Sequence, residues 1–267
     1  MFHFSPISDA ELALLRQQCY LSLTAPMDGM WDSLIHRAVV KGIFYKETCI
    51  GYLCHDQAFT LINFFVQDVW LNQKAVILAQ LLDEDAYPQA YVSTNHPCFL
   101  AACMEFTKEI SIYYYLFEDM RDIAQQAMLS PEFIDADFVK AEQEDVDKIV
   151  QFCQQTTTAD KAWLTQYIQE WVDKEGVYYL NREGEILGTC EIRKSETQAV
   201  YADLGAIVSA DHRTKGLGTY LMLKAKAICY EQDLRPICSC RYDNAGSKRM
   251  IENSGFVNKH LMLKLRF

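Results

Sequence analysis

A short run of basic residues and glycines in the second half of the chain has the composition of a phosphate-binding loop. It reads Arg213, Thr214, Lys215, Gly216, Leu217, Gly218, and Thr219 follows it. A helix leaves its first backbone N–H groups without partners, and its dipole places partial positive charge there. Two glycines would let a diphosphate approach those groups, and the basic side chains would add charge. The loop is therefore predicted to bind a diphosphate.

Such a loop needs a buried strand before it and a helix after it. The residue pattern predicts a strand over residues 200–208, which ends at Val208, and a helix over residues 219–231. The run lacks the Gly-Lys-Ser/Thr ending of a P-loop and the three-glycine pattern of dinucleotide-binding folds. The run therefore matches neither of these two nucleotide-binding motifs.

The flanking sequence predicts a mixed α/β domain around this unit. Helices are expected over 145–154, 161–171 and 247–253, and strands over 177–181, 186–194, 237–242 and 260–267. The resulting order is helices, a three-stranded meander, and then helix, strand, helix and strand.

Residues ~140–267 resemble the GNAT superfamily of N-acetyltransferases. The family's motif, Gln/Arg-x-x-Gly-x-Gly/Ala, is met by Arg213, Gly216 and Gly218. A second block is met by Asn244-Ala245-Gly246-Ser247, followed by Glu252-Asn253-Ser254-Gly255-Phe256. The resemblance implies a mostly antiparallel sheet flanked by helices, whose fourth and fifth strands splay apart around the thioester of acetyl-CoA.

The resemblance also assigns residues to this co-substrate. The backbones of Ile207 and Val208 are expected to bond the pantetheine arm, and the N–H groups of residues 213–219 the pyrophosphate. Asn244 and Ser247 are expected to reach the far side of the cofactor. The implied reaction is direct attack of a primary amine on the thioester in a ternary complex. The expected amine is that of a small molecule.

The second block departs from the family at one position. Many members place a Tyr four residues before the Gly of the Gly-Phe pair, as general acid to the leaving thiolate, and this chain has Ile251 there. Tyr242, solvent or another group would then supply the proton, or catalysis is lost. Tyr242 also fits an aromatic residue that packs at a strand end. A non-catalytic acyl-CoA-binding or sensing protein is therefore the alternative function.

Glu191 and Asp203 are the candidates for the base that takes the amine's proton. A turn centred on residues 195–198 would pair them directly, and two adjacent carboxylates would raise the pKa of at least one. A register slip of one residue or a bulge would change this arrangement. They could instead be solvated carboxylates paired with Arg193.

The first half of the chain is predicted to repeat the second in degenerate form. Residues 61–66 align with 204–208, and residues 91–95 align with 239–244, each a strand that precedes a helix or ends in Asn. The first half has no Arg-x-x-Gly-x-Gly loop. We therefore expect two GNAT-like domains in tandem, over residues 1–130 and 131–267, of which the first binds no CoA and shapes the acceptor cleft.

The composition of the chain limits the classes of molecule that the protein is expected to bind. Residues 1–135 carry 7 basic and 17 acidic side chains, within a net charge of -11, which argues against nucleic acid and weakly favours a cationic acceptor. No apolar run is long enough to span a membrane, and the N-terminus does not resemble a signal peptide. The ten Cys show no metal-binding spacing and indicate a reducing, cytoplasmic compartment, with no metal site.

Overall fold

The chain forms two compact units in a computed structural model that describes all residues except 85–86 and 121–126. The first unit comprises residues 1–116 and 259–267, and the second comprises residues 117–258. This division differs from the predicted boundary at residue 130. The last nine residues belong to the first unit because Met262–Arg266 pair with Gln89–Ser93 in an antiparallel ladder.

The first unit is a mixed sheet with helices. Its strands are β1 (Phe2–Ser5), β2 (Val39–Tyr45), β3 (Thr48–His55), β4 (Thr60–Val66), β5 (Gln89–Ser93), most of β6 (Glu109–Asp119) and most of β12 (Phe256–Arg266). Its helices are α1 (Asp9–Ser22), α2 (Gly29–Arg37), α3 (Lys74–Glu84) and α4 (Pro97–Met104), with the 3₁₀ helix η1 (Asp68–Gln73). The strand order includes β1-β2-β3-β4-β5-β12.

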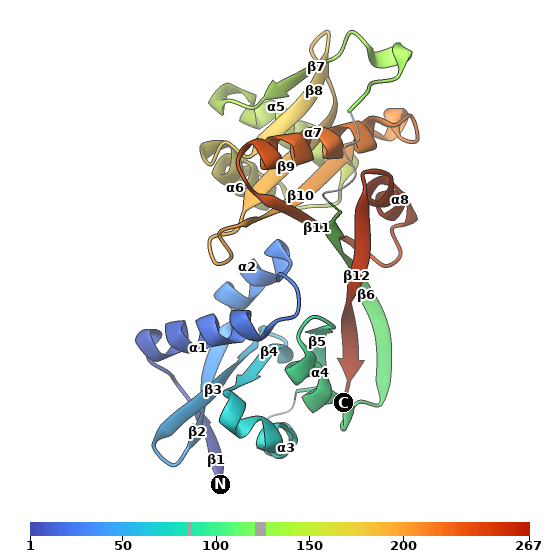
Figure 1. Cartoon of the computed structure of the whole chain (residues 1–267). Helices are drawn as coiled ribbons and strands as arrows, with labels where there is room; N and C mark the ends of the chain where they lie inside the picture. The colour runs from blue at the N-terminus through green and yellow to red at the C-terminus, as the bar shows by residue number, and fades with distance from the viewer. Residues whose placement is uncertain (85–86, 121–126) are drawn as a thin grey trace. The chain divides into compact units, whose positions relative to one another are not determined.

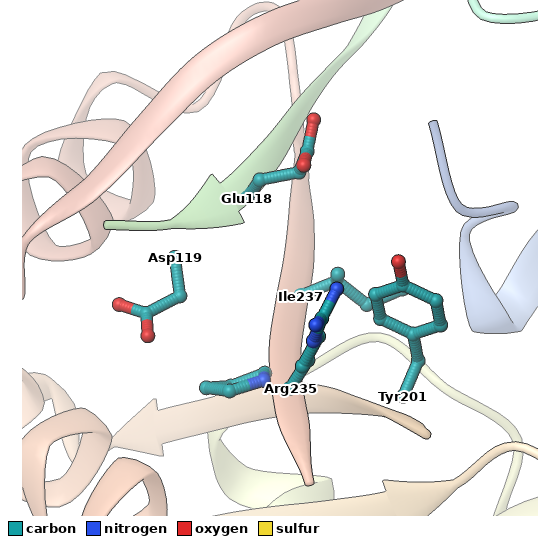
Figure 2. A pocket seen from close by; sticks show the side chains of 6 residues that line it. Glu118, Asp119, Tyr201, Arg235 and Ile237 are labelled. Carbon is teal, nitrogen blue, oxygen red and sulfur yellow. The ribbon is translucent and has the colours of Figure 1, made fainter. Parts of the chain in front are cut away.

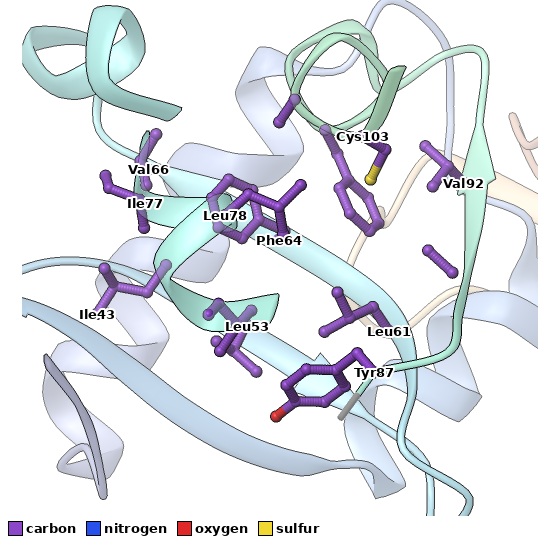
Figure 3. Packing of buried hydrophobic residues seen from close by; sticks show 14 of the residues in the cluster. Ile43, Leu53, Leu61, Phe64, Val66, Ile77, Leu78, Tyr87, Val92 and Cys103 are labelled. Atoms are coloured by element: carbon purple, nitrogen blue, oxygen red, sulfur yellow. The ribbon is translucent and has the colours of Figure 1, made fainter. Parts of the chain in front are cut away.

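Local sequence explains where these helices start. The Ser8 side chain accepts a hydrogen bond from the Glu11 N–H and so caps the N-terminus of α1. Asp28 caps α2 in the same way through the Trp31 N–H, at 3.0 Å. Apolar residues of β3, β4, α3 and α4 fill the core between sheet and helices, with Leu53, Phe64 and Leu78 almost fully buried (Figure 3).

The second unit contains the predicted loop. Its strands are β7 (Asp137–Lys140), β8 (Val177–Arg182), β9 (Glu185–Lys194), β10 (Tyr201–Val208) and β11 (Arg235–Arg241), in the order β11-β10-β9-β8-β7. Its helices are α5 (Val146–Thr156), α6 (Lys161–Asp173), α7 (Leu217–Glu231) and α8 (Ala245–Asn253), with short 3₁₀ turns η2 (Pro131–Phe133), η3 (Gln143–Asp145) and η4 (Ala210–His212). The predicted mostly antiparallel sheet flanked by helices is confirmed, and β7 is a further four-residue strand.

Helices cover both faces of this sheet (Figure 1). A Cβ on Gly188 of β9 would meet the Leu221 side chain of α7 at 2.8 Å, so this face of β9 packs on α7. Side chains alternate along a strand, so Glu191 points to the opposite face, where the Tyr167 hydroxyl of α6 contacts it. The hydrophobic cluster of α5 and α6 lies on that face.

The parallel ladder between β10 and β11 is short. It joins Tyr201 to Arg235, Ala202 to Pro236 and Asp203 to Ile237, and then it ends. The antiparallel ladder between β10 and β9 continues to Val208 without a bulge. Residues Gly205–Val208 of β10 are therefore partly exposed, although the strand lies inside the sheet. The predicted splay of these two strands is present in the structure.

A buried ion pair holds the end of β6 to α7 within the second unit. Lys226 Nζ lies 2.6 Å from Asp119 Oδ1, and both side chains are only 3% exposed. Tyr230 donates to the other Asp119 oxygen, and Lys226 also donates to the Ser254 carbonyl at 2.8 Å. Removing one charge would leave the other buried without compensation.

We expect Lys226→Met to lower the unfolding free energy of the second unit by about 3–5 kcal/mol, because Asp119 keeps its buried charge. Adding Asp119→Asn should restore part of the loss. The control is Lys248→Met, whose exposed pair with Glu252 should contribute at most about 1 kcal/mol. Urea unfolding with a separate fit for each unit checks this, and an unchanged transition in Lys226→Met would contradict it.

Candidate active site

The open edge of β10 offers backbone groups to a ligand. Ser209 N–H donates to the Leu187 carbonyl, so residues 209, 207, 205 and 203 direct their backbone groups toward β9 in this regular ladder. Leu204, Ala206 and Val208 then direct their N–H and C=O groups away from β9, to the side that β11 has left. The predicted backbone role fits Val208. It does not fit Ile207, whose backbone faces β9, and Ala206 offers that role instead.

The loop after β10 has the backbone shape of an anion-binding turn. Thr214 has φ +64 and Gly216 has φ +87, so two residues of the loop adopt the left-handed conformation. Such turns orient successive N–H groups into a concave surface. Helix α7 starts at Leu217, two residues earlier than predicted, and no side chain caps its N-terminus. The N–H groups of Leu217, Gly218 and Thr219 therefore point out of its first turn.

The two loop glycines differ in role. A Cβ on Gly216 would meet nothing within 4 Å, so its positive φ is what requires glycine. A Cβ on Gly218 would lie 2.5 Å from Met250 Sδ of α8 and 3.5 Å from the Val208 side chain. Gly218 is therefore needed for the close packing of α7 on α8, a role that the sequence did not indicate.

The cations of the loop are already in contact with the protein. Lys215 Nζ pairs with Glu132 Oε1 at 2.8 Å and lies over the Phe133 ring. Arg213 is exposed, and its Nε donates weakly to the Val208 carbonyl at 3.4 Å. Both side chains reach solvent, so they could turn to a phosphate. Glu132 is an acidic neighbour that the loop sequence does not reveal.

The second sequence block follows β11. Asn244 caps α8, because its side chain accepts from the Ser247 N–H at 3.0 Å. Tyr242 lies one residue beyond β11 and is 51% exposed. Ile251, at the position where a Tyr would be expected, is buried in α8. Gly255 has φ +82, the left-handed conformation that glycine commonly adopts just after the end of a helix.

Glu191 and Asp203 share one guanidinium. Arg193 Nη1 lies 2.5 Å from Glu191 Oε2, and its Nη2 lies 3.2 Å from Asp203 Oδ1. The Tyr167 hydroxyl donates to Glu191 Oε2 at 2.5 Å and accepts from Arg193 at 2.9 Å. We call these four residues, Tyr167, Glu191, Arg193 and Asp203, the polar cluster. Gly205 makes room for it, because a Cβ there would lie 3.0 Å from Arg193 Nη1.

The environment sets the charges of the polar cluster. Burial opposes the charge of Arg193, but attraction to Asp203, Tyr167 and Glu191 outweighs it and raises the guanidinium's pKa well above its usual value. Burial and the Glu191 carboxylate raise the pKa of the Tyr167 hydroxyl, which stays neutral. With both carboxylates ionised, the cluster carries one net negative charge close to the open edge of β10.

The predicted direct pairing of Glu191 with Asp203 is wrong. Glu191 lies opposite Gly205, and Asp203 lies opposite Arg193. The cause is a longer turn, in which Ser195 N–H donates to the Tyr201 carbonyl. The shift is two residues, so both carboxylates remain on one face. They are buried rather than solvated, and the suggested partner, Arg193, does contact both. No described residue bonds Glu191 Oε1.

The first unit contains a counterpart of the splay between β10 and β11. Its strands β4 and β5 pair in parallel only at Thr60–Leu61 with Gln89–Ala90. A 3₁₀ helix without glycine, η1, then follows β4. The first unit, whose sequence has no Arg-x-x-Gly-x-Gly loop, therefore has η1 at the place where the second unit has that loop.

The first unit also contains a group of buried polar side chains. Cys19 Sγ is 3.6 Å from His96 Nε2, and Asn63 donates to the Tyr52 hydroxyl at 2.8 Å. Burial raises the pKa of Cys19 to about 11 and lowers that of His96 to about 4. Thiol and imidazole are thus both neutral near pH 7, and the pair does not form a reactive thiolate.

Among the described residues, no group of three or more His, Cys, Asp or Glu could hold a metal ion. The same part of the chain forms no helix with the length and apolar character that a bilayer crossing requires.

Two family models match the chain. The model described as "Acetyltransferase (GNAT) domain" matches residues 8–120, and the model described as "Acetyltransferase (GNAT) family" matches residues 143–256. The two matches correspond to the two halves that the sequence comparison aligned. No curated protein matches the chain at a significant level.

Solved structures share the fold of the whole chain. An acetyltransferase of the GNAT family from Colwellia psychrerythraea is 22% identical, with a TM-score of 0.91, and the match covers 100% of this chain and 99% of that one. A GCN5-related N-acetyltransferase from Sphaerobacter thermophilus is 15% identical, with a TM-score of 0.71 and coverage of 99% and 95%. A tandem GNAT protein from the clavulanic acid biosynthesis pathway is 16% identical, with a TM-score of 0.66 and coverage of 99% and 98%.

We expect Gly218→Ala to lower stability more in the wild-type background than in Met250→Ala, because Met250 occupies the space that the new methyl group needs. The coupling between the two substitutions should be about 1 kcal/mol. Gly246→Ala is the control, since its Cβ would meet only Asn244 Oδ1 at 3.7 Å. Urea unfolding of the four variants of the cycle measures the coupling. Additive effects of the two substitutions would contradict the packing role.

Proposed function

Because this chain belongs to the GNAT acetyltransferases, with two GNAT domains in tandem, we propose that it transfers an acetyl group from acetyl-CoA to the primary amine of a small molecule. Membership in this family makes the protein an acyltransferase and favours an enzyme over the non-catalytic alternative. The observation that carries the proposal is the open edge of β10 in the second unit, with the uncapped start of α7 after the strand and Glu191 opposite Gly205 on β9.

The residues of the second unit fit a CoA thioester. The uncapped N–H groups at the start of α7 and the side chains of Arg213 and Lys215 suit a pyrophosphate. The backbone groups of Ala206 and Val208 suit the amides of a pantetheine arm, which would replace the ladder that β11 does not make. Asn244 already caps α8, so Ser247 is the better candidate for a side-chain contact with the cofactor's far side.

When bound, acetyl-CoA supplies a thioester carbonyl that an amine can attack. In this proposal Glu191 takes the proton from the amine through Oε1, while its Oε2 stays bonded to Tyr167 and Arg193. Asp203 holds Arg193 in place. The net negative charge of the polar cluster favours the positive charge that develops on the attacking nitrogen. Tyr242 or solvent returns a proton to the leaving thiolate, because Ile251 cannot.

The compartment is part of the same proposal. All ten cysteines lie in the described part of the chain and are free. Free thiols suit a reducing environment, and we place the protein in the cytoplasm.

Glu191→Gln should lower kcat about 10²–10⁴-fold, because the amide keeps the shape of the side chain but cannot accept the proton. The Kd for acetyl-CoA should stay the same. The assay follows thiol release with polyamines, aminoglycosides and amino acids as acceptors. Tight binding of acetyl-CoA without turnover on any amine would contradict the proposed transfer. Unchanged kcat in Glu191→Gln would contradict the role of this residue alone.

Lys215→Ala and Glu132→Ala should change acetyl-CoA affinity in opposite directions. Lys215→Ala removes a cation from the loop and should weaken binding about tenfold. Glu132→Ala releases Lys215 from an exposed ion pair and should strengthen binding roughly two- to fivefold. Calorimetric titration of the full chain measures both constants. If both variants bind as the wild type does, the loop is not the pyrophosphate site.

A further inference from the structure

A cavity of about 190 Å³ lies beside the paired ends of β10 and β11 in the second unit (Figure 2). Its walls are formed by Glu118, Asp119, Tyr201, Arg235, Pro236 and Ile237. Tyr201 pairs with Arg235 in the ladder, and Ile237 pairs with Asp203, the last residue of β10 before the strands separate. The cavity therefore lies where β10 and β11 are still paired. Residues 213–219 follow the opposite end of the open edge of β10.

Two charged residues of this cavity differ in their partners among the described residues: Asp119 forms an ion pair, and Arg235 does not. Asp119 is neutralised by Lys226 at 2.6 Å, and Tyr230 donates to it. Arg235 is exposed, and its guanidinium forms no ion pair or hydrogen bond with any residue that the structure describes. Arg193, in contrast, is held by two carboxylates. The cavity thus presents a guanidinium whose hydrogen-bonding groups remain available to a ligand.

The chemistry of a guanidinium selects a planar anion. Its N–H groups match the two oxygens of a carboxylate in a bidentate pair, and such pairs are among the strongest hydrogen bonds in proteins. Tyr201, Pro236 and Ile237 give the cavity apolar walls for a carbon skeleton, and Glu118 adds a carboxylate to its rim. A wall with both charges suits a zwitterion better than a simple anion.

Size points to a small ligand. An engineered cavity of about 150 Å³ in another protein takes up benzene, so the present volume suits a molecule with the dimensions of an amino acid. The ladder connects the cavity to the polar cluster, because Ile237 lines the cavity and pairs with Asp203, which contacts Arg193.

We propose that this cavity binds the carboxylate end of an amino-acid acceptor and that Arg235 is its carboxylate-binding residue. The inference rests on the proposed acetyl transfer, because it names the acceptor class of the same site. It also adds a carboxylate to the cationic acceptor that the charge of the first half weakly favours.

Binding tests the inference without turnover. The full chain, saturated with CoA, is titrated calorimetrically with the twenty amino acids and with the amide of each one that binds. The acid should bind roughly tenfold more tightly than its amide, or better, and Arg235→Gln should remove the difference. Arg241→Gln is the matched control on the same strand, because Arg241 already pairs with Asp243 and should leave the preference intact. Equal binding of acid and amide, no binding of any amino acid, or an unchanged preference in Arg235→Gln would overturn the inference.

Turnover separates this inference from the proposed function. Acetylation of L-lysine and of cadaverine, which lacks the carboxylate, is compared in the wild type and in Arg235→Gln. The variant should raise KM for lysine about tenfold while kcat and the rate with cadaverine stay the same. If the wild type acetylates cadaverine as readily as lysine, the carboxylate site fails and the acetyl transfer stands. If amino acids bind through Arg235 but no amine is acetylated, the site stands and the proposed function fails.

Discussion

The parallel ladder between β10 and β11 ends after the pairing of Asp203 with Ile237, and the candidate site depends on this early end. A strand inside a sheet normally has both edges paired, and leaving buried backbone groups unpaired is costly. Here one edge of β10 remains open from Leu204 onward. The open edge is where a ligand with amide groups could complete the sheet. In open α/β sheets, ligands commonly bind where neighbouring strands diverge in this way.

The open edge is supported from both faces of the sheet. Helix α7 starts at Leu217 and packs on β9 through Leu221, while Gly218 brings it close to α8. On the other face, α6 contributes Tyr167 to the polar cluster. Buried charges of this kind rarely add to stability, so their retention fits a role in positioning or chemistry. The polar cluster has little spare room, because a Cβ on Gly205 would lie only 3.0 Å from Arg193 Nη1.

Features determined by neighbouring residues could be predicted from the sequence. Local patterns predict the strand that ends at Val208, the glycine-containing loop after it and the helix that follows, and each is present. The family resemblance of the second half follows from motifs and their spacing, and that of the first half follows from the alignment of its strands with those of the second.

Features that depend on contacts between distant segments were not predicted. The pairing of Glu191 was displaced by two residues because the length of a turn is not fixed by its polar composition. The contacts of Lys215 with Glu132 and of Gly218 with Met250 join segments far apart in the chain. The same holds for the final strand, which pairs with β5 and so belongs to the first unit. The cavity at Arg235 is formed by residues of three strands, β6, β10 and β11.

The central claim is that an acyl-CoA lies along the open edge of β10 and at the start of α7. Hydrogen–deuterium exchange of the full chain, with and without acetyl-CoA, tests it most directly. The account predicts that acetyl-CoA slows exchange at the amides of Ala206 and Val208 and of residues 216–219, and leaves residues 62–74 of the first unit unchanged. Protection in residues 62–74, or no protection between residues 204 and 219, would contradict it.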